Sequence, residues 1–255
     1  MKSKKIRLDQ LLFIRGLAKT RQKAQAMILA GSVLVDEEKI DKCGTRINEN
    51  VSVRLLDLPM RYVSRGGIKL EGALNHFSVK VDGKVCLDIG SSTGGFTDCL
   101  LQRGAEKVIA VDGGTNQLAW RLRKDLRVRS LEKTNARYLC LEQVGERVEL
   151  VTVDVSFISA ILIISQLPLL LDFGADLLVL VKPQFEVGRG QVGKGGIVRD
   201  SEMQREAVAR VQLKLKELRF VDIGSTESGI QGAGGNREYF LHARWPNGGQ
   251  SDIFS

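Results

Sequence analysis

The sequence predicts an α/β protein in which a doubly wound sheet of seven strands follows a small N-terminal α+β domain. From residue 81 onward, short apolar runs alternate with helical patterns, which favours a parallel sheet covered on both faces. Residues 86–105, CLDIGSSTGGFTDCLLQRGA, have the pattern of a strand, a tight turn and a helix. Residues 1–66 hold 14 Lys/Arg against 7 Asp/Glu, whereas the rest of the 255-residue chain holds 24 against 23. Length and charge together indicate two domains.

The N-terminal domain is predicted from residues 7–56. Thr20 has the residue type of an N-cap, and Gly31 is suited to end the same helix. The predicted elements are a helix around 8–12, a helix between Thr20 and Gly31, a strand at 33–35, a turn at 36–38 and a closing strand at 51–53. The exposed cations around the two helices are Arg7, Arg15, Lys19, Arg21 and Lys23. Basic surface concentrated in one small domain is typical of a polyanion-binding protein, and nucleic acid is the class that we expect.

The second domain is predicted to supply all strands of the sheet. They are expected at 84–89, 107–112, 127–131, 148–153, 177–182, 219–226 and 237–244. Ser201 and Gln204 have the spacing of a capping box for a helix that runs to about residue 218. Val155 to Leu171 is an uncharged run of 17 residues, and a spanning helix needs about 20. We therefore expect a buried helix against the sheet at this run rather than a membrane span.

The cysteine spacing and the N-terminal residues indicate the cellular compartment in which we expect the protein. The four cysteines, Cys43, Cys86, Cys99 and Cys140, show no CxxC spacing, and the first residues lack the apolar core of a signal peptide. We expect a cytoplasmic protein without disulfides and without a metal site.

The turn after the first strand of the sheet is the predicted ligand site. Gly90 allows a sharp turn, and Gly94 and Gly95 allow a ligand to approach the backbone closely. The following helix directs its unpaired N–H groups and positive dipole end at this turn. Asp112 lies 22 residues after Gly90. In nucleotide-binding folds an acid at about this distance contacts the ribose hydroxyls.

The glycine spacing favours one cofactor and leaves others open. DIGSSTGG has the pattern D-x-G-x-x-x-G and lacks a third glycine at the dinucleotide spacing. NAD or FAD remains a possible ligand, because dinucleotides also bind at a strand–turn–helix unit. S-adenosylmethionine fits better, because it lacks a pyrophosphate and offers a carboxylate to the helix end. Asp88 and Asp112 flank the same turn.

Four charged side chains are expected at the same edge of the sheet. Asp154 ends the fourth strand and Lys182 the fifth, Glu238 begins the last strand, and Lys69 lies in a helical stripe ahead of the sheet. Doubly wound sheets build their sites at the carboxyl ends of the strands. Lys182 follows an apolar run, although lysine is almost never buried unpaired. Together, two lysines and two acids directed at one cleft indicate a functional site, whereas any one of them alone would not.

The N-terminal string RLDQLLFIRGLAKTRQKAQAMILAGSVLVDEEKIDKCG resembles the RNA-binding module named after ribosomal protein S-four. The matching features are the opening RLD, the TRQKA helix and the GSVLVD strand. The string departs from the module at its strand turn, where Asp36-Glu37 replaces the usual Asn/Asp-Gly. The resemblance implies recognition of folded RNA by shape and phosphate contacts, with Arg7, Arg15, Lys19, Arg21 and Lys23 as the expected RNA-binding residues.

Motifs along nearly the whole chain resemble the TlyA (hemolysin A) family. These motifs are VSRGGIKL, DIGSSTGGFTDCLLQRGA, VDGGTNQLAWRLR, VDVSFIS, VLVKPQFEVG and GNREYF. The resemblance implies a Rossmann-like, seven-stranded, FtsJ-like methyltransferase domain whose catalytic Lys-Asp-Lys-Glu residues fall on Lys69, Asp154, Lys182 and Glu238. The expected cofactor-binding residues are Asp88, Gly90, Ser91, Ser92, Thr93, Gly94, Gly95, Phe96, Asp112, Asn135 and Asp154. One departure is Gly229, where proline is often found.

The resemblance implies S-adenosylmethionine-dependent methylation of a ribose 2′-hydroxyl in ribosomal RNA, with cytidine as the expected nucleoside. A lysine accepts a proton near pH 7 only where desolvation or a neighbouring cation lowers its pKa. We propose Lys182 as the general base, with Lys69 and the two acids fixing its position and that of the hydroxyl. The alternatives are a non-catalytic RNA-binding ribosome factor and a hemolysin-like membrane-active protein.

The expected domain limits are an RNA-binding domain at 1–58, a linker and preceding helix at 59–80, the methyltransferase domain at 81–247 and a mobile tail at 248–255. The expected partners are ribosomal RNA or ribosomal subunits, and neither a membrane nor a metal. We expect a monomer or a weak homo-oligomer.

Overall fold

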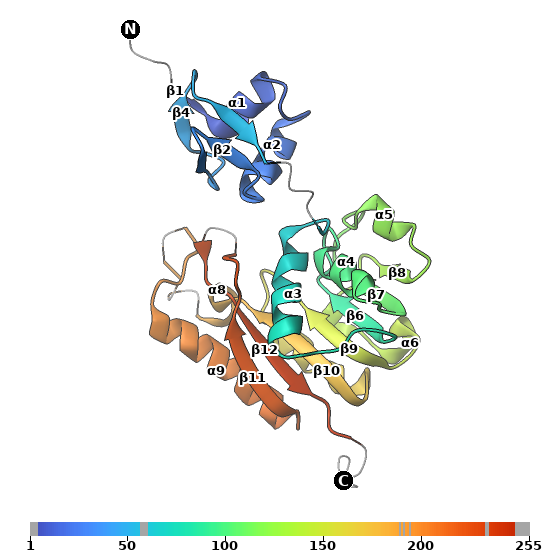
Figure 1. Cartoon of the computed structure of the whole chain (residues 1–255). Coiled ribbons are helices and arrows are strands. Elements are labelled where there is room, and N and C mark those ends of the chain that lie inside the picture. The colour runs from blue at the N-terminus through green and yellow to red at the C-terminus, as the bar shows by residue number, and fades with distance from the viewer. Residues whose placement is uncertain are drawn as a thin grey trace. The chain divides into compact units, whose positions relative to one another are not determined.

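The computed structural model of the chain describes residues 5–56, 61–188, 190, 192–193, 195–232 and 235–247 (Figure 1). The chain divides into two compact units, Met1–Met60 and Arg61–Ser255. Residues 57–60 of the predicted linker and the predicted tail at 248–255 lie outside the described residues.

The first unit joins two helices to two small antiparallel sheets. Its elements are β1 (Lys5–Arg7), α1 (Leu8–Ile14), α2 (Arg21–Leu29), β2 (Val33–Val35), β3 (Glu38–Lys39), β4 (Arg46–Asn48) and β5 (Val53–Leu55). β1 pairs with β4, and β2 lies between β3 and β5. Leu8, Leu12 and Ile28 are fully buried against β2, so the helices form the core with the sheet. The Thr20 side chain accepts a hydrogen bond from the Lys23 backbone N–H at 3.1 Å, which confirms the predicted N-cap.

The turn after β2 keeps its shape without glycine. Asp36 and Glu37 both have positive φ, +48° and +65°. Tight hairpin turns of this kind favour Asn-Gly or Asp-Gly, because few side chains tolerate left-handed backbone. The Asp36 side chain accepts from the Ser52 N–H at 2.9 Å, and Glu37 pairs with Arg54 at 2.5 Å. These two contacts to the β5 side of the hairpin compensate for the missing glycine.

The second unit contains the seven-stranded sheet. Its strands are β6 (Val85–Ile89), β7 (Lys107–Val111), β8 (Val128–Leu131), β9 (Val148–Val153), β10 (Leu171–Val181), β11 (Val221–Glu227) and β12 (Tyr239–Arg244). The order across the sheet is β11-β12-β10-β9-β6-β7-β8. β10, β9, β6, β7 and β8 pair in parallel, whereas β12 is antiparallel to both of its neighbours. The predicted α/β fold with seven strands is confirmed.

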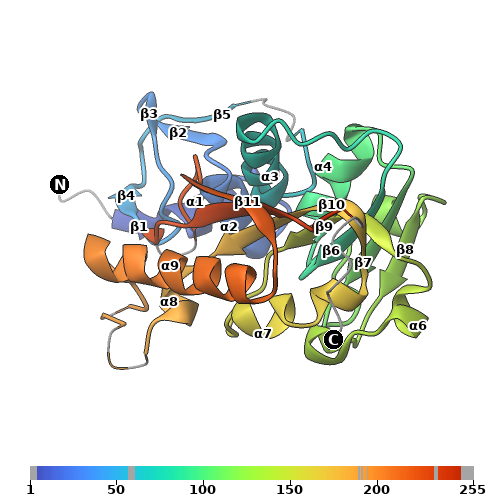
Figure 2. The same ribbon diagram turned by 90° about the horizontal axis from the view of Figure 1, so that it is seen from below.

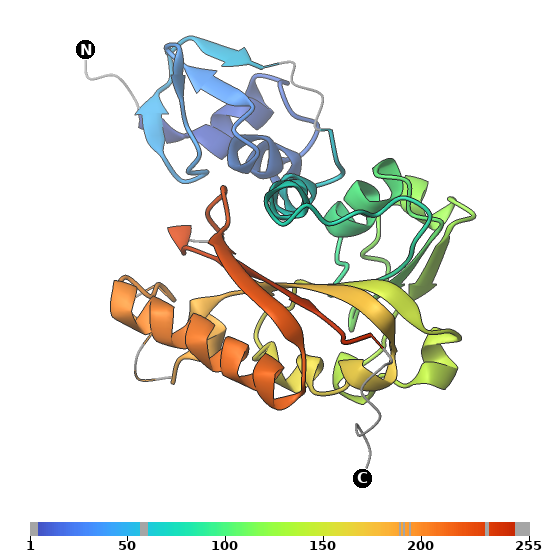
Figure 3. The same ribbon diagram turned by 60° about the horizontal axis from the view of Figure 1, so that its bottom comes forward.

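Helices cover both faces of this sheet (Figure 2 and Figure 3). The helices are α3 (Arg65–His76), α4 (Gly95–Gln102), α5 (Trp120–Arg123), η1 (Ala136–Tyr138), α6 (Leu141–Val144), α7 (Ile161–Ile164), η2 (Leu167–Leu169), α8 (Pro183–Glu186) and α9 (Ser201–Glu217). α3 and α4 share one core with one face of the sheet, and α7 and α9 share a second core with the other. Val179 of β10 belongs to the second core and its neighbour Leu180 to the first. Successive side chains of a strand point to opposite faces, so a strand covered on both sides has the continuous apolar sequence seen here.

Two local predictions were wrong. The uncharged run 155–171 does not form one buried helix, because α7 and η2 are short and β10 already begins at Leu171. Pro168 lies within η2, where it cannot donate a helical hydrogen bond. The N-cap of α9 is Asp200 rather than Ser201, and its side chain accepts from the Glu202 N–H at 2.7 Å. In the parts of the chain that the structure describes, we find no helix with the length and apolarity to cross a membrane.

Candidate active site and RNA-binding surface

The carboxyl ends of β6 and β9 meet where the order of the sheet reverses direction. From β6 the chain moves outward through β7 and β8, then returns to place β9 on the other side of β6. Open α/β sheets bind their ligands at this kind of switch point. Gly90 follows β6 with φ +85°, and a Cβ atom there would lie 2.4 Å from the Asp154 carbonyl oxygen after β9. Glycine is therefore required at Gly90 by both conformation and space.

A cavity of about 710 Å³ opens at this edge, which is a usual size for a small-molecule site. Four segments that follow strands line it. They contribute Gly90 and Ser92 after β6; Asp112, Gly113 and Gln117 after β7; Lys133, Thr134, Asn135 and Ala136 after β8; and Asp154, Val155, Ser156, Phe157 and Ile158 after β9. Of the predicted cofactor residues, the cavity thus gathers Gly90, Ser92, Asp112, Asn135 and Asp154.

Asp112 holds two backbone segments of the cavity together. Its Oδ2 accepts from the Ser92 N–H at 2.8 Å and its Oδ1 from the Gly114 N–H at 2.7 Å. A carboxylate has about four lone-pair positions, so each oxygen keeps capacity for a hydroxyl donor. The arrangement fixes an acceptor for a diol at the edge of the cavity.

The other predicted cofactor residues, Asp88, Ser91, Thr93, Gly94, Gly95 and Phe96, are not among the residues that line the cavity. At Gly95 a Cβ atom would lie 2.1 Å from the Ser64 hydroxyl and 3.0 Å from the Gly67 backbone nitrogen. The close approach at this glycine is therefore that of the N-terminal end of α3. Phe96 packs in the core, with its ring 6.0 Å from that of Phe240. A cofactor contact at these six positions stays a prediction.

Asp88 is fully buried inside β6. Its carboxylate accepts hydrogen bonds from the hydroxyls of Thr97 at 2.6 Å and Thr152 at 3.0 Å. Burial raises the pKa of Asp88 to about 6, and the two threonine hydrogen bonds oppose that rise. Asp88 thus joins β6 to the first turn of α4 and to β9, beneath the turn that bears Gly90.

The four predicted catalytic residues form two withdrawn ion pairs. Lys69 Nζ lies 2.5 Å from Glu238 Oε2, and their side chains are 11% and 3% exposed. Lys182 Nζ lies 2.6 Å from Asp154 Oδ1, with 11% and 24% exposure. Lys182 also donates to the Ser156 hydroxyl at 2.8 Å.

Strand register explains why residues so far apart in sequence reach one edge. Val181 and Tyr239 are the last register pair of β10 and β12. Lys182 and Glu238 each lie one residue beyond that pair, and Asp154 directly follows β9, the parallel neighbour of β10. Lys69 reaches the same edge from α3 through its contact with Glu238.

The segments after β8 and β9 contain cavity residues that the sequence did not predict. Lys133 and Phe157 are examples, and both have positive φ, +53° and +67°. Phe157 is 92% exposed, so neither apolar periodicity nor burial marked it. The only usable sequence signal was position, because each residue lies within a few residues of a strand end.

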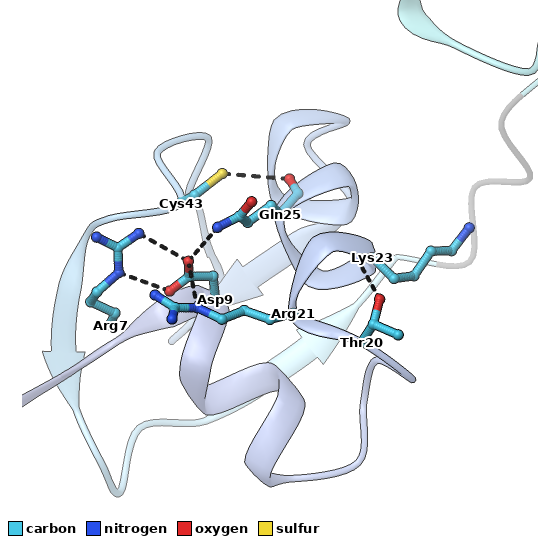
Figure 4. Close-up of polar contacts among 7 residues, drawn as sticks. All are labelled: Arg7, Asp9, Thr20, Arg21, Lys23, Gln25 and Cys43. Atoms are coloured by element: carbon cyan, nitrogen blue, oxygen red, sulfur yellow. Dashed lines mark hydrogen bonds and ion pairs between the residues drawn. The ribbon is translucent and has the colours of Figure 1, made fainter. Parts of the chain in front are cut away.

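In the first unit, one buried acid binds two of the five predicted RNA-binding cations (Figure 4). Asp9 is fully buried and accepts two hydrogen bonds from Arg7, at 3.0 and 2.9 Å. It also accepts from Arg21 Nε at 3.3 Å and from the Gln25 amide at 2.8 Å. Arg7 above all holds the pKa of Asp9 well below its usual range. The arginine side chains remain 42% and 52% exposed, so the acid orients them while leaving surface on each guanidinium.

The remaining predicted cations of this unit are arranged differently. Arg15 donates to the carbonyl oxygens of Val51 at 2.9 Å and Glu49 at 2.5 Å. Lys19 and Lys23 are exposed, and the Lys23 side chain extends away from Asp9 (Figure 4). The structure therefore brings Arg7 and Arg21 together and leaves the other three cations at separate positions.

Comparison with known proteins assigns both units. Residues 62–245 match the FtsJ-like methyltransferase family and residues 6–53 match the S4 domain. YqxC of Bacillus subtilis, by name a candidate rRNA methyltransferase, is 49% identical over 98% of this chain and 89% of its own length. The 16S/23S rRNA (cytidine-2′-O)-methyltransferase TlyA of Mycobacterium tuberculosis is 45% identical over 95% of this chain and 91% of its own.

A solved structure supports the same assignment. A candidate hemolysin from Streptococcus thermophilus aligns with a TM-score of 0.74 and 42% identity, over 98% of this chain and 93% of that one. The chain therefore belongs to the TlyA (hemolysin A) family, which joins an S4 domain to an FtsJ-like methyltransferase domain.

Proposed function

We propose that this protein transfers a methyl group from S-adenosylmethionine to a ribose 2′-hydroxyl of ribosomal RNA, with cytidine as the nucleoside. The observation that carries the proposal is the pair of withdrawn lysine–acid contacts, Lys69–Glu238 and Lys182–Asp154, at the edge of the sheet where the cavity opens. Charged side chains are almost never buried unless they are paired, so two lysine–acid pairs at the carboxyl edge of a doubly wound sheet suit a functional site. The cytidine 2′-hydroxyl is the substrate named for the Mycobacterium tuberculosis relative.

The cavity fits the cofactor. S-adenosylmethionine, when bound, supplies an electrophilic methyl group on a sulfonium centre. Asp112 offers carboxylate oxygens to ribose hydroxyls, and its two backbone donors already hold it in place. Asn135 and Thr134 add polar groups beside apolar Val111 and Ala136. This combination suits the adenine of the cofactor, which has polar edges and apolar faces.

The ion pairs suit the acceptor half of the reaction. Methyl transfer is an in-line displacement in which positioning carries much of the catalysis, and the attacking hydroxyl loses its proton as it attacks. Lys182, in its neutral form, is the group that we propose to accept this proton, which converts it to the ammonium that pairs with Asp154. Asp154 and Ser156 hold its Nζ at 2.6 and 2.8 Å, so its place is set before substrate arrives. Lys69 and Glu238 provide a second oriented pair for the ribose.

The S4 unit is proposed to supply RNA affinity. Arg7 and Arg21 present guanidinium groups fixed by one buried acid, and fixed arginine forks match phosphate oxygens. Lys19 and Lys23 add exposed point charges. Recognition through phosphate contacts supplies affinity, whereas the methyltransferase unit selects the reacting nucleotide.

The test is methyl transfer from isotopically labelled S-adenosylmethionine to ribosomal subunits purified from cells that lack this protein. We expect label in ribosomal RNA and one or more new 2′-O-methylated cytidines by nucleotide mapping. Binding of S-adenosylmethionine, measured separately by calorimetry, distinguishes the alternatives. RNA binding without cofactor binding or label would support a non-catalytic ribosome factor instead.

A further inference from the structure

Glu186, the last residue of α8, is bonded to the end of a segment whose earlier residues line the cavity. Its Oε2 accepts from the Ser159 hydroxyl at 2.5 Å and its Oε1 from the Ala160 backbone N–H at 2.7 Å. Ser159 and Ala160 end the segment 154–160 between β9 and α7, and residues 154–158 of that segment line the cavity. The carboxylate therefore holds the far end of the segment whose first residue is Asp154.

The start of segment 154–160 is also held by α8. Lys182, the N-cap of α8, contacts Asp154 at 2.6 Å and Ser156 at 2.8 Å. Between the two ends, the Phe185 ring lies 5.4 Å from the Phe157 ring. One turn of helix thus contacts the segment at its start, middle and end, and Glu186 makes the contact at the end.

Phe157 shows why this segment needs anchors. Its φ is +67° and its side chain is 92% exposed. Left-handed backbone at a residue with a Cβ atom is strained and persists only where surrounding contacts impose it. An exposed ring offsets little of that strain through burial. The conformation is therefore imposed by contacts with α8, to Lys182 at one end of the segment and Glu186 at the other, with the Phe185 ring between them.

The surroundings of Glu186 indicate that the main partners of its carboxylate are the Ser159 hydroxyl and the Ala160 N–H. Burial raises the pKa of Glu186, and the hydrogen bonds from Ser159 and Ala160, followed by the charge of Arg210, lower it. Arg210 donates to the backbone oxygen of Glu186 at 3.2 Å. Within the described residues no lysine or arginine forms an ion pair with the Glu186 carboxylate itself. Two hydrogen bonds to one segment are therefore the direct compensation for its burial.

We propose that Glu186 is a positioning residue for methyl transfer, which holds segment 154–160 in the conformation that directs Asp154, Ser156 and Phe157 to the cavity. The role rests on the proposed function, because it acts through Asp154 and Ser156 on Lys182. Loss of the Glu186 contacts frees the strained residue to relax and moves the cavity wall.

The test compares Glu186→Ala, Glu186→Gln and Ser159→Ala with the wild-type full-length protein. Glu217→Ala, which removes a surface glutamate paired with Lys214, is the matched control. Affinity for S-adenosylmethionine is measured by calorimetry, and kcat and KM are measured on ribosomal subunits. Melting temperature reports folding.

In Glu186→Ala we expect kcat to fall about 10- to 100-fold, since displacements near 1 Å cost about that much, with cofactor affinity reduced several-fold. Glu186→Gln keeps an acceptor for the Ala160 N–H, and its amide can donate to the Ser159 hydroxyl. This variant should recover activity to within about threefold of wild type, whereas Glu217→Ala should match wild type.

Two outcomes overturn the positioning role. One is wild-type kcat and cofactor affinity in Glu186→Ala, and the other is equal loss in Glu186→Ala and Glu186→Gln, which would require the charge rather than the hydrogen bonds. If Glu186→Ala does not fold, Ser159→Ala decides: it keeps the Ala160 contact and should lower kcat by roughly 3- to 10-fold. Unchanged activity in that variant also overturns the role. A wild-type protein that neither binds S-adenosylmethionine nor transfers methyl groups contradicts the proposed function instead.

Discussion

The two units use buried carboxylates in opposite ways. In the S4 unit, fully buried Asp9 has partners that remain exposed, with Arg7 at 42% and Arg21 at 52%. At the edge of the seven-stranded sheet, Lys69 and Lys182 are both reduced to 11% exposure beside their acids. An acid beneath exposed arginines orients cations for an external anion. Lysines withdrawn together with their acids suit chemistry on a single bound group. Under the proposed function, RNA is held at the first of these sites and modified at the second.

Asp88 provides a third arrangement and sharpens the comparison. It is as buried as Asp9, but its partners are the neutral hydroxyls of Thr97 and Thr152. Arginine hydrogen bonds lower the pKa of Asp9, whereas burial raises the pKa of Asp88 to about 6. The two pKa values thus shift in opposite directions: at Asp9 the charged arginines outweigh burial, whereas at Asp88 burial outweighs two neutral hydroxyl donors.

The largest effect is expected at the withdrawn lysine. Replacement Lys182→Ala should reduce methyl transfer to ribosomal RNA by about 10²- to 10⁴-fold, the usual contribution of a positioned general base. S-adenosylmethionine affinity should change little, because Asp112 and Asn135 are untouched. Lys214→Ala, which removes a lysine from a surface pair with Glu217, is the control and should retain full activity. Full activity in Lys182→Ala would sink the assignment of this lysine as the base.

The second prediction concerns the pH dependence of stability. The folded pKa of Asp88 lies at about 6, above the ordinary 3.8, so between these pH values the folded state binds more protons than the unfolded state. The Asp88 contribution to stability is therefore greatest below pH 3.8 and falls as pH rises to 6, by on the order of 3 kcal/mol in total. Asp88→Asn cannot titrate and should lack this decline.

Denaturant unfolding followed by tryptophan fluorescence measures this difference, because Trp120 and Trp245 both lie in the second unit. The free energy of unfolding of wild type relative to Asp88→Asn should fall from pH 4 to pH 6.5 and then stay level. A relative free energy that rises over this range would mean that the Thr97 and Thr152 hydrogen bonds outweigh burial.

The strands, a helix cap and the group of residues at the strand ends could be predicted, because each depends on local sequence or on a general rule of α/β sheets. Six of the seven strands lie within two residues of their expected limits, β10 begins at Leu171 rather than 177, and Thr20 caps its helix. The Lys182–Asp154 and Lys69–Glu238 pairs were anticipated as a group because strand ends of one sheet converge. Which lysine pairs with which acid was not predicted, because it depends on the tertiary placement of β9 beside β10 and of α3 beside β12.

Features that depend on tertiary packing could not be predicted. Gly94 and Gly95 resemble a ligand-binding turn, but at Gly95 the atoms that require glycine belong to the start of α3, far away in sequence. Asp9 was unmarked because a single acid in a basic segment has no periodic signal. The apolar run 155–171 was taken for one helix because its continuous apolarity does not show where a short helix gives way to a strand.

The third prediction tests whether Asp9 orients the arginines. Asp9→Asn keeps the size of the side chain but removes its charge, so the net charge of the S4 unit becomes more positive. If attraction alone determined affinity, RNA binding would strengthen. We expect instead a roughly tenfold loss, since Arg7 and Arg21 lose their fixed orientation and ordering each long side chain on binding costs about 0.5–1.5 kcal/mol.

The matched control for Asp9→Asn is Glu37→Gln, which makes the same charge change at an exposed pair with Arg54. Fluorescence anisotropy with a ribosomal RNA fragment at two salt concentrations compares the variants. Glu37→Gln should bind as wild type or slightly better. If Asp9→Asn behaves in the same way, the buried acid does not organise the RNA-binding surface.

The smallest effect is expected at the exposed lysines of the S4 unit. Lys23 extends away from the Asp9 cluster (Figure 4), so Lys23→Ala should leave the melting temperature unchanged. It should weaken RNA binding only a few-fold and reduce the slope of log affinity against log salt by about 1. Lys216→Ala, which removes an exposed lysine on α9 of the second unit, should leave that slope unchanged.

Because Asp9→Asn changes the orientation of the arginines rather than the number of cations, it should lower affinity at a nearly constant salt slope. A large slope change in Asp9→Asn, or none in Lys23→Ala, would remove the distinction between oriented arginines and free lysines.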